Sequence, residues 1–415
     1  MHKIERLLQT LAPKGVEFKT LEQVFEIKNG YTPSKNNPEF WEKGTIPWFR
    51  MEDIRENGRI LKDSIQHITP KALKGKKLFP KNSIIISTTA TIGEHALLIV
   101  DSLANQRFTF LSKKANCGIA LDMKFFFYQC FLLGEWCKKN TNVSGFASVD
   151  MTAFKKYKFP IPPLEIQQEI VKILDAFTEL NTELNTELKA RKKQYEYYQN
   201  MLLDFKGINQ NHKDAKMSAK TYPKRLKTLL QTLAPKGVEF RKLGEVCDFQ
   251  KGKSITKKAV TFGKVPVISG GRQPAYYHNE ANRSGETIAI SSSGVYAGYV
   301  SYWDIPVFLA DSFSVSPKQK TLMPKYLFHY LTTQQDAIHA TKSTGGIPHV
   351  YSKDLQNFLI PIPPLEIQQE IVKILDQFLA LTTDLLAGIP AEIEARKKQY
   401  EYYREKLLTF KLLKA

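Results

Sequence analysis

Hydrophobic residues recur every three or four positions between residues 164 and 190, with polar residues between them. This spacing places them on one face of a helix and predicts a long amphipathic α-helix. Pro162 and Pro163 precede it and suit a helix entry, where the missing proline N–H costs nothing. With its basic and aromatic end, ARKKQYEYYQNMLLDF (190–205), the predicted helix runs for about forty residues, roughly 60 Å if unbroken. The apolar positions are Ile166, Ile170, Ile173, Phe177, Leu180, Leu184 and Leu188.

Three segments occur twice in nearly identical form, which indicates two tandem copies of one module. The second copy supplies a second long helix, so we expect an antiparallel pair of helices that links two globular lobes. Gly388 and Pro390 interrupt the second helix and predict a kink or break there. The repeated segments are LLQTLAPKGVEF (7–18 and 229–240), PIPPLEIQQEIVKILD (160–175 and 361–376) and ARKKQYEYY (190–198 and 395–403).

The interiors of the two copies differ but keep a common pattern. IIISTTATIGEHA (84–96) resembles IAISSSGVYAGYV (288–300), because each is a β-branched run followed by hydroxyl residues and a glycine. Such runs, broken by Gly, Pro and Asn, predict strands mixed with a few helices, hence an α+β interior. The predicted fold is two mixed α/β domains in a pseudo-twofold tandem arrangement, joined by two long antiparallel helices that form a coiled-coil spacer. The predicted divisions are a first globular domain (1–159), a central long helix (160–205), a basic linker (206–228), a second globular domain (229–360) and a distal long helix (361–415).

The chain carries a net charge of +19, from 60 Lys and Arg against 41 Asp and Glu, which favours an anionic partner. The excess lies in the globular interiors and the linker, whereas the two predicted long helices carry no net positive charge. Nucleic acid would therefore meet the globular parts, and the helices would face protein. The chain opens without a leader-like segment and its longest apolar stretch is too short for a bilayer, so we expect a cytoplasmic protein with no membrane partner.

Catalytic motifs are weak in this sequence. GKS at 252–254 resembles part of a phosphate-binding loop, but Cys247 stands where that motif requires glycine. NNPEFW (36–41) has Glu39 where the adenine methyltransferase motif requires a second proline. The eight histidines lack metal-ligand spacing. We therefore predict no catalytic residue, no metal site and no cofactor in this chain.

The two variable interiors, each followed by PIPPLEIQQEIV and an EARKKQYEYY-like end, resemble the specificity (S, HsdS) subunit of type I restriction-modification systems over essentially the whole chain. The resemblance implies that each interior is a target recognition domain, which reads one half of a split double-stranded DNA site without catalysis of its own. It also implies that the paired helices hold the domains apart and dock two methyltransferase (M) subunits, and that restriction (R) subunits join the complex. S-adenosylmethionine, ATP and Mg²⁺ would serve those partners, which carry adenine-N6 methyltransferase and ATP-dependent endonuclease activities.

A four-residue unit is repeated in TELNTELNTEL (178–188), within the first predicted long helix. In the family that the chain resembles, such a repeat sets the length of the unspecified spacer between half-sites. Four helical residues add about 6 Å and a net rotation of roughly 40°, close to the ~35° between adjacent base pairs of B-DNA. We assign Thr178, Leu180, Leu184 and Leu188 to this ruler; the alternative is a solvated helix with no such role.

Candidate DNA contacts lie in the glycine-flanked loops of both interiors. Lys and Arg bind phosphates, while Arg, Asn and Gln can make bidentate contacts to base edges. The alternative for each is a solvated surface residue or, for the tyrosines, a half-buried core aromatic. In the first interior the candidates are Arg50, Lys74, Lys76, Lys77, Thr88, Thr89, Thr91, Asn105, Gln106, Arg107, Ser144 and Ser148. In the second they are Arg272, Gln273, Tyr276, Tyr277, Asn282, Arg283, Ser292, Ser293, Tyr296, Lys342, Thr344 and His349.

The identical helix ends supply candidate contacts to M subunits: Tyr195, Tyr198, Tyr400 and Tyr403. Two symmetry-related partners would each find the same surface there; the alternative is that identity reflects a recent duplication alone. Two other functions stay open: a non-catalytic two-lobed coiled-coil scaffold that binds protein partners, and a methyltransferase or nuclease with unrecognised motifs. Length, duplication and charge placement favour a DNA-recognition subunit over both.

Overall fold

The computed structural model of the chain describes residues 2–75, 77–142, 147–205, 222–318, 320–343, 346–383 and 388–413. Two compact units are present: unit 1 comprises residues 1–183 and 394–415, and unit 2 comprises residues 184–393. Each unit therefore holds one globular interior together with the helix end of the other copy. The predicted divisions follow chain order and do not include this exchange, and most of the predicted linker lies outside the described residues.

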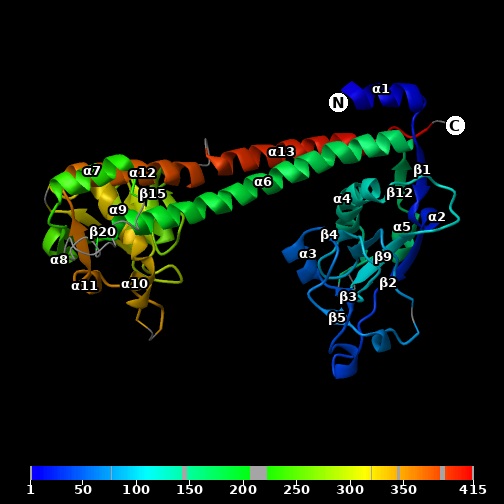
Figure 1. The fold of residues 1–415 in the computed structure, drawn as a ribbon, viewed down its shortest axis with the longest axis horizontal. Helices are drawn as coiled ribbons and strands as arrows, with labels where there is room; N and C mark the ends of the chain where they lie inside the picture. The colour runs from blue at the N-terminus through cyan, green and yellow to red at the C-terminus, as the bar shows by residue number, and fades with distance from the viewer. Residues whose placement is uncertain are drawn as a thin grey trace. The chain divides into compact units, whose positions relative to one another are not determined.

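In the described part of unit 1, a central sheet has the order β2 (Phe25–Asn29), β9 (Phe108–Lys113), β6 (Ser83–Ser87), β7 (His95–Leu98) and β4 (Ile60–Leu61), and a smaller sheet has the order β5 (His67–Ile68), β3 (Ile46–Phe49) and β8 (Leu103–Ala104). All five residues of β6 are buried, as expected for a strand covered on both faces. Helix α4 (Met123–Lys139) packs against β6 and β7 (Figure 1). The Asp122 side chain caps α4 by accepting from the N–H groups of Lys124 and Phe125.

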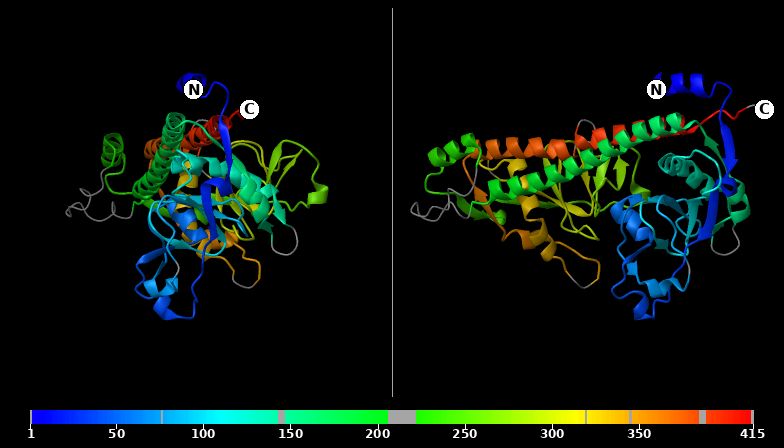
Figure 2. Two further views of the ribbon diagram at one scale, coloured as in Figure 1. Left: turned by 90° about the vertical axis from the view of Figure 1, so that its right-hand side faces the viewer. Right: turned by 45° about the vertical axis from the view of Figure 1, so that its right-hand side comes forward.

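The described part of unit 2 repeats this plan, with one sheet in the order β14 (Cys247–Lys251), β20 (Ser312–Pro317), β17 (Thr287–Ser291) and β18 (Val300–Trp303), and another in the order β16 (Tyr276–His278), β15 (Val265–Ile268) and β19 (Phe308–Leu309). Helix α9 (Pro324–Thr333) packs against β17, β18 and β20, and α12 (Leu365–Thr383) packs on α9 (Figures 1 and 2). The matching strand orders confirm the duplication predicted from the sequence.

The repeated segments at the two ends of each interior pair with each other. β1 (Glu17–Thr20) runs antiparallel to β12 (Lys158–Ile161), and β13 (Glu239–Lys242) runs antiparallel to β21 (Leu359–Ile362). The end of the GVEF segment in each copy therefore pairs with the strand that ends within the PIPP motif. Shorter helices complete the units: α1 (His2–Leu11), α2 (Leu21–Val24), α3 (Met51–Asn57), α5 (Met151–Lys156), α7 (Lys224–Leu233), α8 (Leu243–Val246), α10 (Gln335–Ala340) and α11 (Ser352–Leu355).

The first long helix, α6 (Leu164–Leu203), is unbroken, as the sequence predicts. The second is divided into α12 and α13 (Ile389–Leu408), which confirms the predicted interruption. Pro390 lies in the first turn of α13. Backbone N–H groups in the first turn have no acceptor within the helix, so the absence of an N–H on proline costs no hydrogen bond there.

The helical segments are antiparallel, as predicted. In unit 1, Phe177 of α6 stacks on Tyr403 of α13, with ring centroids 5.6 Å apart. In unit 2, Tyr198 of α6 stacks on Phe378 of α12 at 5.2 Å. Because the earlier residue of α6 meets the later residue of the return segment, the two run in opposite directions. The predicted fold class is therefore confirmed.

Candidate nucleic-acid interface

A tight loop joins β6 to β7 in unit 1 and carries the hydroxyl run of the sequence. The N–H of Gly93 donates to the carbonyl of Ser87 (2.9 Å), and the Ser87 hydroxyl donates to the carbonyl of Thr89 (2.8 Å). Gly93 has a φ of +89°, and a Cβ there would lie 2.6 Å from the Gly134 carbonyl oxygen of α4. Only glycine fits this position, and its lack of a side chain lets the loop lie close to α4.

The residue that follows this loop reinforces it. A ring nitrogen of His95 lies 3.2 Å from the carbonyl oxygen of Gly93. Burial lowers the pKa of His95 to about 3, so the ring is neutral at physiological pH. The fixed loop presents a defined set of polar groups at the surface of unit 1.

The loop that precedes the PIPP motif pairs with this hairpin loop. The N–H of Val149 donates to the carbonyl of Thr88 (2.9 Å), and Thr89 forms an isolated antiparallel bridge with Ser148. Two predicted DNA contacts, distant in sequence, thus lie together. The Thr88 hydroxyl, in contrast, is buried in a hydrogen bond with Thr109 (3.0 Å).

Unit 2 builds the same joint from different residues. The N–H of Val350 donates to the carbonyl of Ser292 (2.9 Å), and Ser293 bridges to His349. Gly298, with a φ of +87°, takes the place of Gly93 and donates its N–H to Ser291 (2.7 Å). The second set of predicted contacts is therefore also brought together.

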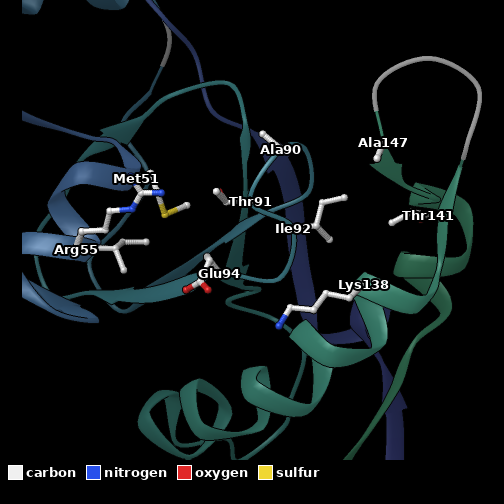
Figure 3. Close-up of a pocket in the computed structure, with 10 residues that line it drawn as sticks. Met51, Arg55, Ala90, Thr91, Ile92, Glu94, Lys138, Thr141 and Ala147 are labelled. Carbon is white, nitrogen blue, oxygen red and sulfur yellow. The ribbon is translucent and has the colours of Figure 1, made fainter. Parts of the chain in front are cut away.

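Two adjoining hollows border the joint in unit 1, with volumes of about 570 and 300 Å³. They share Met51, Arg55 and Thr91. Figure 3 shows the larger hollow between α3, the β6–β7 loop and α4, with Arg55 and Lys138 on opposite sides. Its one carboxylate, Glu94, is paired with Arg59 at 2.6 Å.

The smaller hollow is strongly basic. Four cations line it, and Glu52 is the acidic residue among its lining. Its other polar lining comes from Ser87, Thr91 and Asn105. This density of positive charge beside hydroxyl and amide groups is typical of a surface that binds phosphates and base edges. The cations are Lys35, Arg50, Arg55 and Arg107.

Backbone contacts position two of these arginines. The buried Asp53 carboxylate accepts from the N–H of Arg50 (2.6 Å) at the start of α3. Asn105 accepts from the N–H of Arg107 (2.9 Å), which fixes the turn between β8 and β9. The Arg107 side chain, like that of Gln106 beside it, is exposed.

Three further cations line these hollows and are not among the contacts predicted from the sequence: Lys35, Arg55 and Lys138. Arg55 lies in MEDIREN and Lys138 follows Trp136 and Cys137, so each looks like an ordinary solvated position on a helix. Spacing alone could not place either of them at the same hollow as Thr91, since the fold brings these residues together.

Several other predicted contacts lie outside these hollows or outside the described residues. Lys74 places its Nζ atom 5.3 Å from the centre of the Phe40 ring, and Lys77 lines a separate hollow of about 690 Å³ beside Phe79. In unit 2 the guanidinium of Arg272 lies 5.0 Å from the ring of Tyr296. Gln273, Tyr276 and Tyr277 are exposed, and Lys342 is half-buried. Lys76, Ser144 and Thr344 lie outside the described residues.

Asn282 and Arg283 are engaged within unit 2. The Asn282 side chain donates to the carbonyl of Leu309 (2.8 Å) and accepts from its N–H (2.7 Å). The Arg283 guanidinium donates to the Ser314 hydroxyl and to the carbonyls of Gln250, Lys251 and Asn282. These bonds hold the loop against the sheet, so we leave both residues out of the proposed surface.

The four tyrosines predicted to contact M subunits are half-buried within the units. Tyr195 shares a hydrogen bond of 3.3 Å with His329, and Tyr198 and Tyr403 stack as described above. The ring centroids of Tyr400 and Phe177 are 6.2 Å apart. The exposed members of the two repeats are instead Tyr197 and Tyr402, at 59% and 60% exposure.

Over the described ranges, no group of three or more His, Cys, Asp and Glu side chains could hold a metal ion. In the same ranges, no helix has the length and apolar character needed to cross a membrane.

Residues 13–193 and 235–395 match the family described as the type I restriction modification DNA specificity domain. The type I restriction enzyme EcoprrI specificity subunit of Escherichia coli is 41% identical over 400 residues, covering 93% of both chains. The EcoR124I/EcoR124II specificity subunit of the same species is 33% identical over 306 residues, covering 65% of this chain and 69% of that one.

A solved structure has the same fold. It is the S subunit of a type I restriction-modification system from M. genitalium, with a TM-score of 0.59, 20% identity and coverage of 95% of this chain and 96% of that one. The duplication, the paired long helices and the matched ranges agree with the resemblance found in the sequence. The chain belongs to the family of type I restriction-modification specificity subunits.

Proposed function

We propose that each unit binds one half of a bipartite site in double-stranded DNA, through the joint between its hairpin loop and the loop that precedes PIPP. The observation that carries this proposal is the basic hollow beside the joint in unit 1, lined by four cations and one carboxylate. Phosphate contacts from the cations would position the duplex, and the hydroxyl and amide groups of the loops would meet base edges.

We infer that the chain itself recognises DNA and does not catalyse. Its partners would be two M subunits and the R subunits, which would carry adenine-N6 methyl transfer and DNA cleavage. S-adenosylmethionine, ATP and Mg²⁺ would bind to those partners, and the complex would work in the cytoplasm, where its DNA is. The relatives' names, which describe subunits of type I restriction enzymes, support this assignment.

Replacing Lys35 and Arg55 with Ala is expected to weaken DNA binding about equally for all sequences. Each lost phosphate contact should also reduce the slope of log affinity against log salt by about one. The measurement is a mobility-shift titration at several salt concentrations, using the chain purified with its M partner. Lys114, which donates to the Glu22 carbonyl away from the hollow, is the matched control. A wild-type complex that binds no duplex would favour the scaffold function instead.

Replacing both Tyr197 and Tyr402 with Ala is expected to reduce co-purification of the M subunit at least several-fold. Both rings are exposed at equivalent positions of ARKKQYEYY, so two copies of one partner could use them in the same way. Phe at both positions keeps the ring and is the control. Tyr195 and Tyr198 are unsuitable for this test because their loss would also loosen unit 2. Full assembly of the double Ala variant would place the docking surface elsewhere.

A further inference from the structure

One position of the interface carries opposite charges in the two units. In unit 1, Ser87 of β6 pairs with Phe108 of β9, and the residue before Phe108 is Arg107. In unit 2, Ser291 of β17 pairs with Ser312 of β20, and the residue before Ser312 is Asp311. The strand registers therefore make Arg107 and Asp311 equivalent.

Hydrogen bonds to the hairpin loops confirm this equivalence. The N–H of Thr88 donates to the carbonyl of Arg107 (3.2 Å), and the N–H of Ser292 donates to the carbonyl of Asp311 (3.0 Å). Both residues are thus tied by their backbones to the loop that pairs with the segment before PIPP. Arg107 and Asp311 therefore occupy the same position in the corresponding joints of the two units.

The side chains have different surroundings. Arg107 is exposed in the basic hollow, and it has no hydrogen-bonding or ionic partner for its guanidinium among the described residues. Asp311 is half-buried, and one oxygen of its carboxylate accepts from the hydroxyl of Ser293. A carboxylate can accept further bonds through its other oxygen.

We propose that this position reads one base in each half-site and makes the two half-sites different. Arg107 would donate both hydrogen bonds to O6 and N7 of a guanine in the major groove. Asp311 would accept from the exocyclic amino group of a cytosine or an adenine. This inference rests on the proposed function, since it requires that both units bind DNA through these joints.

Charge supports a specificity role for Asp311. A carboxylate at a DNA-binding surface repels phosphates and so lowers affinity for every sequence. A carboxylate is useful there only where a base offers a hydrogen-bond donor. The matched duplex then forms a hydrogen bond that offsets the repulsion, and mismatched duplexes do not. The exposed guanidinium of Arg107 is suited to the commonest specific contact, the bidentate pair with guanine.

The test compares wild type with Arg107→Gln and Asp311→Asn, each purified as the full chain with its M partner. Each complex is mixed with a randomised duplex library, and the bound fraction is sequenced. Arg107→Gln is expected to cut the preference for guanine at one position of one half-site by about 10- to 100-fold. Asp311→Asn is expected to do the same for cytosine or adenine at one position of the other half-site.

Ser293→Ala separates base reading from loop support. It removes the hydroxyl that binds Asp311 but keeps the carboxylate, so the preference at the one base position that Asp311 reads should persist, whatever the Ser293 hydroxyl contributes at other positions. Asp311→Asn and Ser293→Ala would both lower affinity evenly, with an unchanged motif, if Asp311 only supports the loop; that result overturns the proposal. Should Asp311→Asn fail to fold, the exposed Arg107→Gln variant decides alone. A wild-type complex without any motif would instead overturn the proposed function.

Discussion

Inserting one more TELN unit into α6 is expected to lengthen the unspecified spacer of the recognised DNA site by one base pair and to leave both half-sites unchanged. The repeat lies inside a helix that is unbroken from Leu164 to Leu203. The division between the compact units falls within the repeat, after Glu183. Four added helical residues would therefore shift the part of α6 in unit 2 by about 6 Å along the helix axis and rotate it by a net 40° relative to the part of α6 in unit 1.

The insertion should be tolerated by the fold. Leu184 is buried and Leu180 and Leu188 are half-buried, so a new Leu four residues on continues the same face. The return segment is already longer, because Asp376 and Arg396 are 20 positions apart, whereas Asp175 and Arg191 are 16 apart. One inserted unit would make the two arms equal in residue number.

Methylome sequencing of cells that carry the inserted chain with its M partner measures the spacer directly. A three-residue TEL insertion is the control, because it turns the helix by about 300° and moves the following apolar stripe off its face. That variant should lose methylation rather than change the spacer. An unaltered spacer in the TELN variant would show that the repeat is only a solvated stretch of helix.

Periodicity and self-comparison were enough to predict the long helices, their antiparallel direction and the interruption at Gly388 and Pro390. These features depend on local spacing and on identity between copies, which a single sequence displays. The sheets also follow from β-branched runs such as Ile84–Ile86, although their pairing does not. The sequence predicts two separate groups of hydroxyl residues in each interior, but it does not show that the two groups pair across the joint.

Other features needed the tertiary structure. The helix ends are exchanged between the units, so Tyr195 and Tyr400 lie half-buried against opposite interiors. Arg283 looks like a DNA contact in the sequence but binds four groups of its own unit. The match between Arg107 and Asp311 is hidden because the turn before the strand is one residue longer in unit 1, and only the strand register aligns them.

The repeated PIPPLEIQQEI segment also conceals a difference between its two adjacent glutamines. Gln167 is fully buried: it accepts from the N–H of Asp122 (2.8 Å) and donates to the carbonyls of Ala120 (2.9 Å) and Pro162 (2.6 Å). Gln168 is exposed. In unit 2, Gln368 makes the equivalent three bonds to Met323, Thr321 and Pro363. Gln167 thus joins α6 to the start of α4 and to the PIPP motif, and Gln368 joins α12 to the start of α9 and to the second PIPP motif.

Replacing Gln167 with Met is expected to destabilise unit 1 by about 3–5 kcal/mol. The substitution keeps the length of the side chain but removes the partner of the Asp122 N–H and of the Ala120 and Pro162 carbonyls. The bond to Pro162 is buried and the other two are partly buried, and each lost bond costs about 1–3 kcal/mol where the group stays shielded from water. Gln368→Met should have the same effect on unit 2.

Hydrogen exchange followed by mass spectrometry, together with urea unfolding, separates the two units. Gln167→Met should speed exchange in residues 120–142 and 147–162, and Gln368→Met should speed it in residues 321–343 and 346–363. Gln168→Met and Gln369→Met are matched controls, because both glutamines are exposed one position away and should change stability by less than about 0.5 kcal/mol. Equal effects at the buried and exposed glutamines would mean that helix propensity, and not the three hydrogen bonds, explains why the segment carries glutamine twice.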